Sequence, residues 1–282
     1  MPLLTLHDLE QASPLFRRKV GHIVGHGVMS MLSINKVNML YDRHRHLRGP
    51  AFAHSVLQDL DITYNIYAKT PEVINQLRRL SQGTPFITIS NHPYGSMDGV
   101  ILADYFGHLY PSYKIVANRL LQRIEALSPS FISVTPTGAS HTAPTSESIL
   151  GIRHALTHLR SGGPLGLFPA GAVSDLSVRE HCVRDREWQL PIIRFIAKAG
   201  VPILPVHFFG GNSLFYYLLG LIDWRIRLLR LPAEVFNKSR QPIGLGIGEF
   251  IGVEEQQEYL ATHTIEEYGL WLRRKVYDMS IG

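Results

Sequence analysis

Apolar residues in the first part of the chain recur at intervals of three and four positions. This spacing is typical of amphipathic helices and extends from Pro14 to about Leu60, where a second helical segment at residues 51–57 ends near Asp59. The first part of the pattern is carried by Ile23, Val24, Met31 and Leu32. We therefore expect a helical region over residues 1–60.

From Ile62 onward, short runs of β-branched and aromatic residues alternate with helical segments. The expected strands cover residues 61–68, 86–90, 114–118, 131–135, 165–170, 201–210 and 241–251. The expected helices cover residues 71–80, 98–110, 147–163, 190–200 and 254–279. This alternation predicts an α/β domain with a largely parallel sheet flanked by helices.

No internal repeat and no linker rich in Pro, Gly or Ser interrupts the second part of the chain. We therefore predict one structural unit, an α/β domain over residues 61–282, preceded by the helical region at 1–60. Charged residues make up 18% of the chain, against about 25% in a typical soluble domain. This composition predicts an ordered protein with some exposed apolar surface.

The chain is mildly basic, with a net charge of +5 and a pI of 9.3, which favours an anionic partner. Seven lysines and arginines lie between Ser13 and Gly49, opposed by Asp42 alone. This basic region fits a membrane surface or an acidic protein, and it equally fits a solvated face. Because no RNA- or DNA-reading motif accompanies the basic stretches, we expect no nucleic-acid partner.

A single cysteine, Cys182, excludes an internal disulfide and favours a reducing compartment. The amino terminus lacks the pattern of a secretory signal. The longest apolar run, residues 212–224, is too short to span a bilayer. We expect a protein that is soluble or lies on a membrane surface.

The segment at residues 86–99 carries the most informative chemistry. An apolar strand delivers Asn91 and His92 at its carboxyl end, where α/β sheets bind ligands, and Asp98 begins the next helix. A histidine is suited to act as a general base near neutral pH, and a carboxylate can fix its tautomer. The pattern predicts a His/Asp dyad whose nucleophile is the substrate's own hydroxyl or amine. Taken alone, the same residues also fit a turn histidine followed by a helix-capping aspartate.

Five motifs occur in a recognisable order: NHPYGSMDG, KIVANRLLQRIEAL, FPAGAVS, REWQLPIIRFIAKAGVPILPVHFFGGNS and LRLPAEVFNK. With them the chain resembles the glycerolipid acyltransferase (PlsC-like) superfamily over about residues 35–250. More narrowly, it is similar to the bacterial branch labelled as hemolysins or as lysophospholipid-acyltransferase-like. That branch includes the O-acyltransferases of ornithine- and glycine-lipid synthesis.

The resemblance implies the acyltransferase fold and acyl transfer from acyl-CoA or acyl carrier protein to the hydroxyl of a lyso-lipid. His92 would take the proton of that hydroxyl and Asp98 would orient His92, with no acyl-enzyme, no metal and no further cofactor. The sequence does not identify the groups that stabilise the oxyanion; backbone amides near Gly171 are one candidate. The motif positions implied to contact substrate are Asn91, Gly95, Ser96, Phe168, Pro169, Ala170, Gly171, Ser174, Pro205 and Asn212.

The chain departs from the wider superfamily at several motif positions. Five residues separate His92 from Asp98 where four are usual, an extension that Gly95 can absorb. Enzymes with phosphate-bearing acceptors commonly have a glutamate where this chain has Ala170. They commonly have arginines at two further motif positions, where this chain has Val173 and Val134. Since the absent arginines would form charge-assisted bonds to a phosphate, we expect a lyso-aminolipid acceptor of the ornithine- or glycine-lipid type.

Residues 213–232 combine apolar residues with three arginines, a make-up that fits either the headgroup region of a membrane or core packing. Two histidine pairs with four-residue spacing lack the glutamate of zinc proteases, so we expect no metal there. We expect Cys182, beside His181, to be an ordinary cysteine. The arginines are Arg225, Arg227 and Arg230; the histidine pairs are His22 with His26 and His154 with His158.

Together these features predict a peripheral enzyme at the cytoplasmic face of the inner membrane. The alternatives are a 1-acylglycerol-3-phosphate acyltransferase of phospholipid synthesis, a hydrolase with the same dyad, and a non-catalytic, membrane-active protein of the hemolysin type.

Overall fold

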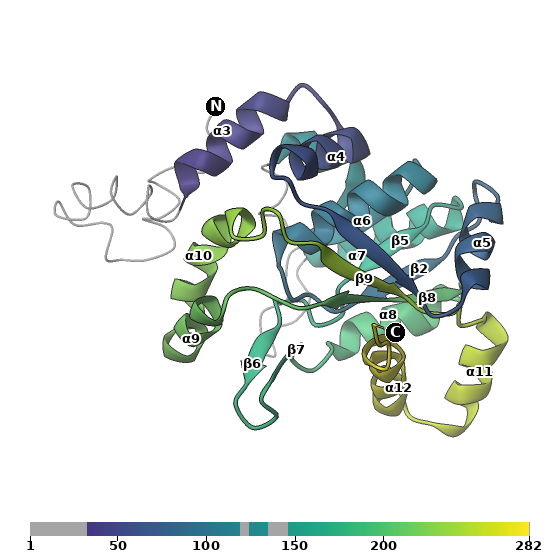
Figure 1. Cartoon of the computed structure of the whole chain (residues 1–282). Coiled ribbons are helices and arrows are strands. Elements are labelled where there is room, and N and C mark those ends of the chain that lie inside the picture. Colours follow the sequence, from purple (N-terminus) through teal and green to yellow (C-terminus); the bar gives the residue numbers. More distant parts are fainter. Residues whose placement is uncertain (1–32, 119–123, 135–145, 282) are drawn as a thin grey trace.

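A seven-stranded sheet lies at the centre of the computed structural model, which describes residues 33–118, 124–134 and 146–281 (Figure 1). Within these residues the strand order is β1-β9-β8-β2-β5-β3-β4. Neighbouring strands are parallel except β8 and β9, so β1 and β9 run opposite to the other five. The prediction of a largely parallel sheet is confirmed. The strands are β1 (Tyr64–Ala68), β2 (Ile87–Ser90), β3 (Lys114–Asn118), β4 (Phe131–Val134), β5 (Leu165–Leu167), β8 (Ile203–Phe209) and β9 (Ile243–Ile247).

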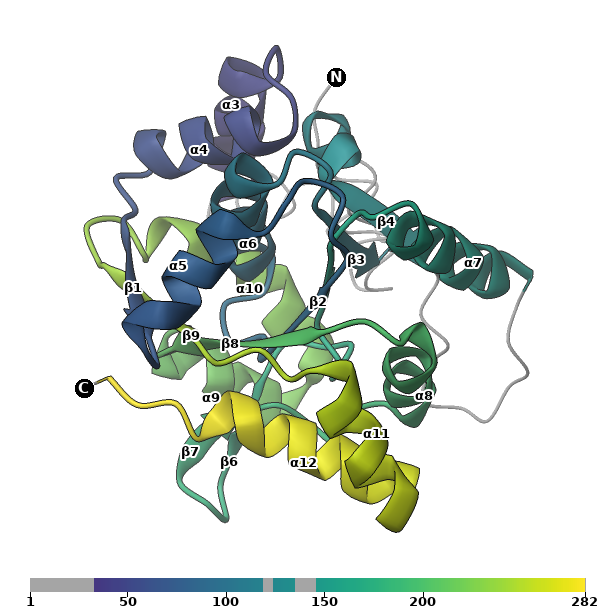
Figure 2. The same cartoon turned by 90° about the vertical axis from the view of Figure 1, so that its right-hand side faces the viewer.

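Helices cover both faces of the sheet (Figure 2). One face packs against α4 (Gly49–Asp59), α5 (Pro71–Arg79) and α6 (Ser96–Leu109). The other packs against α7 (Ser146–Arg160), α8 (Leu190–Ala199) and α12 (Ile265–Tyr277), with α11 (Val253–Thr262) beside α12. All four residues of β2 are buried, as expected for a central strand that helices cover on both faces of the sheet.

The described part of the amino-terminal region is helical, as predicted, and consists of α3 (Ile34–His44) and α4. Residues 1–32, with His22 and His26, lie outside the described residues. Helix α4 packs closely on α6: a Cβ added at Gly107 would lie 2.5 Å from Cγ of Pro50. The division of the chain at residue 60 stays a prediction.

Some elements of the structure were not predicted from the sequence. Residues 125–130 form the short 3-10 helix η3 (Glu125–Ser130), and an antiparallel hairpin follows β5, with strands β6 (Asp175–Ser177) and β7 (Cys182–Arg184). The expected carboxyl-terminal helix divides into α11 and α12, because Thr264 starts a new helix by exchanging hydrogen bonds with Glu267.

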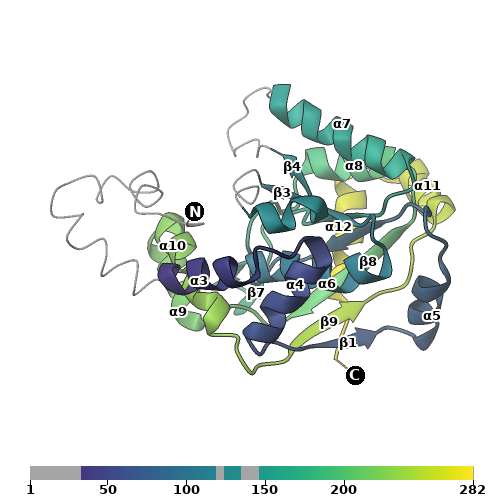
Figure 3. The ribbon, with the colours of Figure 1, turned by 90° about the horizontal axis from the view of Figure 1, so that it is seen from above.

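Residues 213–236 form two helices, α9 (Leu214–Ile222) and α10 (Trp224–Phe236). Both lie at the end of the molecule opposite α5 and α11, where α10 packs against α9 and also contacts α3 (Figures 1 and 3). Across the described ranges, no helix combines the length and apolar character needed to cross a bilayer.

Candidate active site

The turn between β2 and α6 brings His92 and Asp98 together. The strand ends at Ser90 and the helix begins at Ser96, so the polypeptide must reverse within five residues. Gly95 adopts a φ of 73°, a conformation that L side chains rarely adopt. A Cβ at Gly95 would also lie 3.0 Å from Leu231 and 3.3 Å from Val173. A glycine therefore suits this position both in backbone conformation and in space.

His92 Nδ1 lies 2.9 Å from Oδ2 of Asp98. The same Oδ2 accepts the backbone N–H groups of Tyr94 (2.9 Å) and Gly95 (3.0 Å). Asp98 is fully buried, and its Oδ1 has no hydrogen-bond partner among the described residues. Burial raises the pKa of Asp98 above its ordinary value, while the hydrogen bonds from His92 and the two amides act to lower it.

The imidazole of His92 stacks on the ring of Phe168, with centroids 4.1 Å apart and an interplanar angle of 28°. The side chain is 19% exposed, and the structure gives Nε2 no hydrogen bond to a described residue. Phe168 directly follows β5, which pairs with β2 (Ile87 opposite Leu165). Sheet pairing thus unites the two predicted motif segments and leaves one ring nitrogen of His92 available for a substrate.

Asp185 connects these two segments, and sequence reasoning missed it. Its Oδ1 accepts the backbone N–H of His92 (3.1 Å) and the hydroxyl of Ser174 (2.6 Å), while Oδ2 accepts the indole N–H of Trp188 (3.1 Å). Its backbone is held by Tyr277 and by Arg273 of α12. Asp185 stands in no motif with a chemical signature, and only the hairpin β6–β7 returns it to the turn.

The loop after β5 is tightly folded. Gly171 has a φ of 64°, and a Cβ there would collide with Nε2 of Gln189. That Nε2 donates to the carbonyl of Ala170 (3.1 Å), and the backbone N–H of Gln189 donates to Pro169 (2.9 Å). The amide of Gly171 itself donates to the carbonyl of Phe168 (2.9 Å). The amide of Gly171 is therefore already used to close the loop, and a role for backbone amides near Gly171 at an oxyanion stays a prediction.

Other residues predicted to contact substrate have structural partners. Asn91 is buried and exchanges two hydrogen bonds with the backbone of Phe208 (2.9 and 2.7 Å), which fixes the end of β2 against β8. Ser174 is buried, with its hydroxyl on Asp185. Pro205 pairs with Ile89 inside the sheet rather than at its carboxyl end. These three residues contact other parts of the protein and have structural roles next to the site.

Two further predicted residues lie at the margin of the turn. Ser96 is the first residue of α6 and is partly exposed. Asn212 donates its backbone N–H to the hydroxyl of Tyr217 (3.0 Å), and its Nδ2 is buried without a partner among the described residues. Ser96 and Asn212 therefore flank the turn from two different elements.

Two cationic side chains near the turn, those of Arg227 and Lys238, donate hydrogen bonds to acceptors of the protein itself. Arg227, for which the sequence allowed either a membrane surface or core packing, is buried: it forms an ion pair with Asp175 and donates to the carbonyls of Val173 (3.4 Å) and Ser174 (3.3 Å). Lys238 lies 5.2 Å from the ring centroid of Tyr94 and donates to the carbonyl of Gly211 (2.6 Å). Burial lowers the pKa of Lys238.

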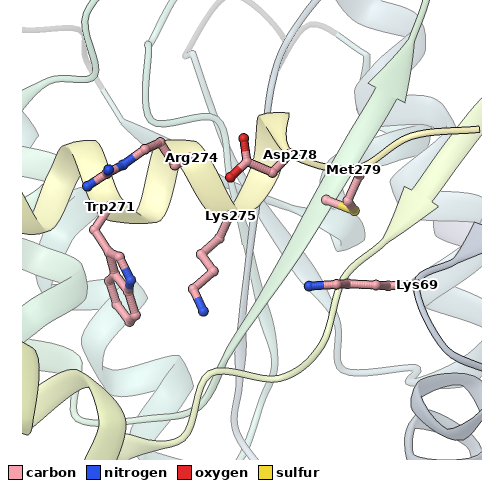
Figure 4. A pocket seen from close by; sticks show the side chains of 6 residues that line it. All are labelled: Lys69, Trp271, Arg274, Lys275, Asp278 and Met279. Carbon is pink, nitrogen blue, oxygen red and sulfur yellow. The ribbon is translucent and has the colours of Figure 1, made fainter.

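A separate hollow of about 320 Å³ lies at the β1 edge of the sheet (Figure 4). Strands β9 and β8 separate β1 from β2, the strand that leads into the His92 turn. Two of its cations have acidic partners, since Lys69 lies 3.7 Å from Glu249 and Lys275 lies 3.2 Å from Glu255. The remaining lining residues are Trp271, Arg274, Asp278 and Met279. This hollow is not part of the His92 site.

The weaker sequence candidates show ordinary contacts. His158 Nε2 lies 3.1 Å from the carbonyl of Pro164, and Cys182 Sγ lies 3.8 Å from Glu180. No cluster of three or more His, Cys, Asp or Glu residues in the described ranges could hold a metal ion.

A family model and individual known proteins match this chain. A family model described as Acyltransferase matches residues 9–281. The lyso-glycine lipid O-acyltransferase of Bacteroides thetaiotaomicron is 25% identical over 222 residues, covering 76% of this chain and 75% of that protein. The lyso-glycine lipid O-acyltransferase of Phocaeicola vulgatus is 27% identical over 214 residues, covering 73% and 72%. The crystal structure of the 1-acyl-sn-glycerophosphate (LPA) acyltransferase PlsC from Thermotoga maritima aligns with a TM-score of 0.45 and 15% identity over 89% of each chain.

Proposed function

Since the chain belongs to the acyltransferase family, whose model matches nearly its whole length, we propose that it transfers a fatty acyl group to the hydroxyl of a lyso-aminolipid. The donor is a thioester, either acyl-CoA or acyl carrier protein, and the reaction takes place at the cytoplasmic face of the inner membrane. The relatives that act on lyso-glycine lipid support this acceptor class.

One observation carries the mechanism: His92 Nδ1 lies 2.9 Å from a fully buried carboxylate while Nε2 remains free of described partners. A hydrogen bond to Asp98 fixes the tautomer in which Nδ1 carries the proton and Nε2 carries the lone pair. This tautomer is the one a general base needs.

In the proposed reaction, Nε2 of His92 removes the proton of the acceptor hydroxyl as its oxygen attacks the thioester carbonyl. A tetrahedral intermediate forms and collapses with cleavage of the C–S bond. The imidazolium then returns the proton to the departing thiolate, so that the products are an ester and a free thiol. Asp98 stabilises the imidazolium between these two proton transfers.

The surroundings of position 173 support the proposal that the acceptor carries no phosphate at this site. Val173 is buried among Tyr216, Tyr217 and Leu231. The nearest guanidinium, that of Arg227, is paired with Asp175 and donates to the backbone of Val173. A phosphate would have to displace these bonds to gain a charge-assisted contact there, which argues for an acceptor that lacks one.

The test compares acceptors side by side. Purified protein is given acyl-CoA or acyl carrier protein as donor, with lyso-glycine lipid, lyso-ornithine lipid or lysophosphatidate as acceptor. We expect the diacylated aminolipid as the main product, and a clear preference for lysophosphatidate would overturn the proposal. Release of fatty acid at the same rate without any acceptor would instead identify a hydrolase. Lipid profiling of a deletion strain gives an independent answer, because the lipid class that disappears names the product.

A further inference from the structure

Helix α9 is apolar on all sides. Its sequence, LFYYLLGLI, contains no charged residue, and a helix of this kind is normally covered all around. One side is covered by protein: Tyr216 and Tyr217 are buried against Val173 and Leu231.

The other side of α9 is bare. Five large apolar side chains are exposed, and their positions i, i+1, i+4, i+7 and i+8 place them along one face of the helix. Ile222, the most exposed of them, is 77% accessible. We call this face the α9 stripe; it consists of Leu214, Phe215, Leu218, Leu221 and Ile222.

The covered side of α9 rests on the candidate active site. The hydroxyl of Tyr217 donates to the carbonyl of Pro93, the residue after His92, at 3.2 Å. Ser213 caps the helix by accepting from Tyr216 and is itself held by Glu234 of α10 (2.8 Å). A single helix thickness, about 10 Å, therefore separates the stripe from the turn that carries His92.

The size of the stripe favours a lipid surface over a protein partner. A nine-residue helix is about 14 Å long, so the stripe is much smaller than the roughly 800 Å² that each partner of a stable protein complex buries. A bilayer accepts such a short apolar face because lipid chains need no shape complementarity. A cation next to the stripe suits anionic headgroups: Arg230, which also pairs with Glu234 at 3.5 Å, lies 5.3 Å from the ring centroid of Phe215.

We propose that the α9 stripe inserts into the headgroup and upper acyl region of an anionic bilayer and holds the His92 turn against the membrane. This inference rests on the proposed function, because a lipid acceptor resides in the membrane. With the stripe inserted, an acceptor lipid can bring its hydroxyl to His92 without leaving the bilayer surface.

A fluorescent probe tests the insertion without reference to activity. In full-length protein with Cys182→Ser, a nitrobenzoxadiazole label is attached at Ile222→Cys, and in a matched control at Leu270→Cys, an exposed position on α12 (56% accessible). On addition of vesicles of phosphatidylethanolamine and phosphatidylglycerol, we expect a blue shift and quenching by lipid-bound quencher at position 222 and no change at position 270. A label at position 222 that stays in water while the protein binds the vesicles would overturn the proposal.

Sedimentation with the same vesicles measures the energetic contribution of the stripe. The triple variant Leu218→Gln, Leu221→Gln and Ile222→Gln keeps good helix formers at exposed positions. It should bind at least tenfold more weakly than the wild type, whereas Leu270→Gln should bind equally well. Unchanged binding of the triple variant, with an unchanged melting temperature, would overturn the proposal.

The two proposals fail in distinguishable ways. If no acceptor is acylated and the probe at position 222 still enters the bilayer, the proposed function fails while membrane insertion of the stripe stands. If acyl transfer proceeds while the probe stays exposed to solvent, the proposed function stands and insertion of the stripe fails.

Discussion

The Oδ2 atom of Asp98 lies 2.9 Å from Nδ1 of His92 and also accepts the backbone N–H of Gly95 at the start of α6. The contact of a helix cap and the contact to a histidine, which the sequence offered as alternatives for this aspartate, therefore occur together, while the catalytic role of the pair stays a prediction. One carboxylate oxygen ties the turn to the helix and to the imidazole at once, so the cap that starts α6 also sets the position of His92.

Replacing His92 by alanine should lower acyl transfer by about 10²–10⁴-fold, which is the usual contribution of a general base. The chain offers a matched control, because His54 forms a second His–Asp pair with Asp104 (3.2 Å) away from the turn. His54→Ala should keep activity within about twofold. Equal losses in both variants, measured as kcat/KM at fixed donor concentration, would show that His92 has no special role.

Asp98→Asn should abolish most activity while leaving the fold at least as stable at pH 8. Burial raises the pKa of the Asp98 carboxyl, so the folded state holds the carboxyl proton more tightly than the unfolded state does. This group thus favours folding below its unfolded pKa of about 3.8, and that contribution is lost as the pH rises through the raised folded pKa. An asparagine carries no charge to bury.

Thermal unfolding at several pH values checks the predicted stability of Asp98→Asn. The melting temperature of Asp98→Asn relative to the wild type should be highest at pH 8 and should fall as the pH is lowered toward 4. A variant that is much less stable than the wild type at pH 8 would mean that the hydrogen bonds to the ionised carboxylate outweigh its desolvation.

Asp185 is predicted to be a positioning residue. Asp185→Ala leaves the backbone N–H of His92, the hydroxyl of Ser174 and the indole N–H of Trp188 without their acceptor. Since each unsatisfied buried group costs about 1–3 kcal/mol, we expect reduced stability and a kcat lowered by roughly 10–100-fold with little change in KM. Ser174→Ala removes one of the three donors and should have a smaller effect. A KM increase at constant kcat would instead indicate a role in binding substrate.

Gly171→Ala should destabilise the protein by more than Gly200→Ala. Both glycines have a similar positive φ, 64° and 62°, but a Cβ at Gly171 collides with Gln189, whereas a Cβ at Gly200 meets no described atom within 4 Å. Left-handed backbone alone costs a non-glycine residue about 1–3 kcal/mol. Denaturant unfolding of the two variants separates this cost from the steric cost, and equal losses would contradict the close packing of the loop after β5.

Arg227→Met should lower the free energy of unfolding by about 2–4 kcal/mol. It leaves Oδ1 of Asp175 and the carbonyls of Val173 and Ser174 without their donor in a largely buried setting, while Arg186 still pairs with Oδ2 of Asp175. Arg230→Met is the control, since Arg230 is more exposed and pairs with Glu234 at the longer distance of 3.5 Å; its loss should cost about 1 kcal/mol or less. Similar losses in both variants would contradict a buried anchoring role for Arg227.

The class of fold and the central dyad were open to sequence reasoning because both depend on local pattern. The β-branched residues of β2 mark it as a strand, and the β2–α6 turn keeps His92 and Asp98 within six positions of each other. The hairpin β6–β7 escaped this reasoning because its strands are three residues long, which is too short for an alternating pattern.

The sequence by itself determined the alternation of strands and helices, the His/Asp pair and the resemblance to acyltransferases. Only the tertiary structure decided that Asp185 holds His92 and Ser174, that Arg227 is buried on Asp175, and that α9 covers the turn with one face and exposes the other. The physical reason is sequence separation. Side-chain periodicity reports which face of one element is apolar, whereas a contact such as that between Pro93 and Tyr217 depends on how distant elements pack.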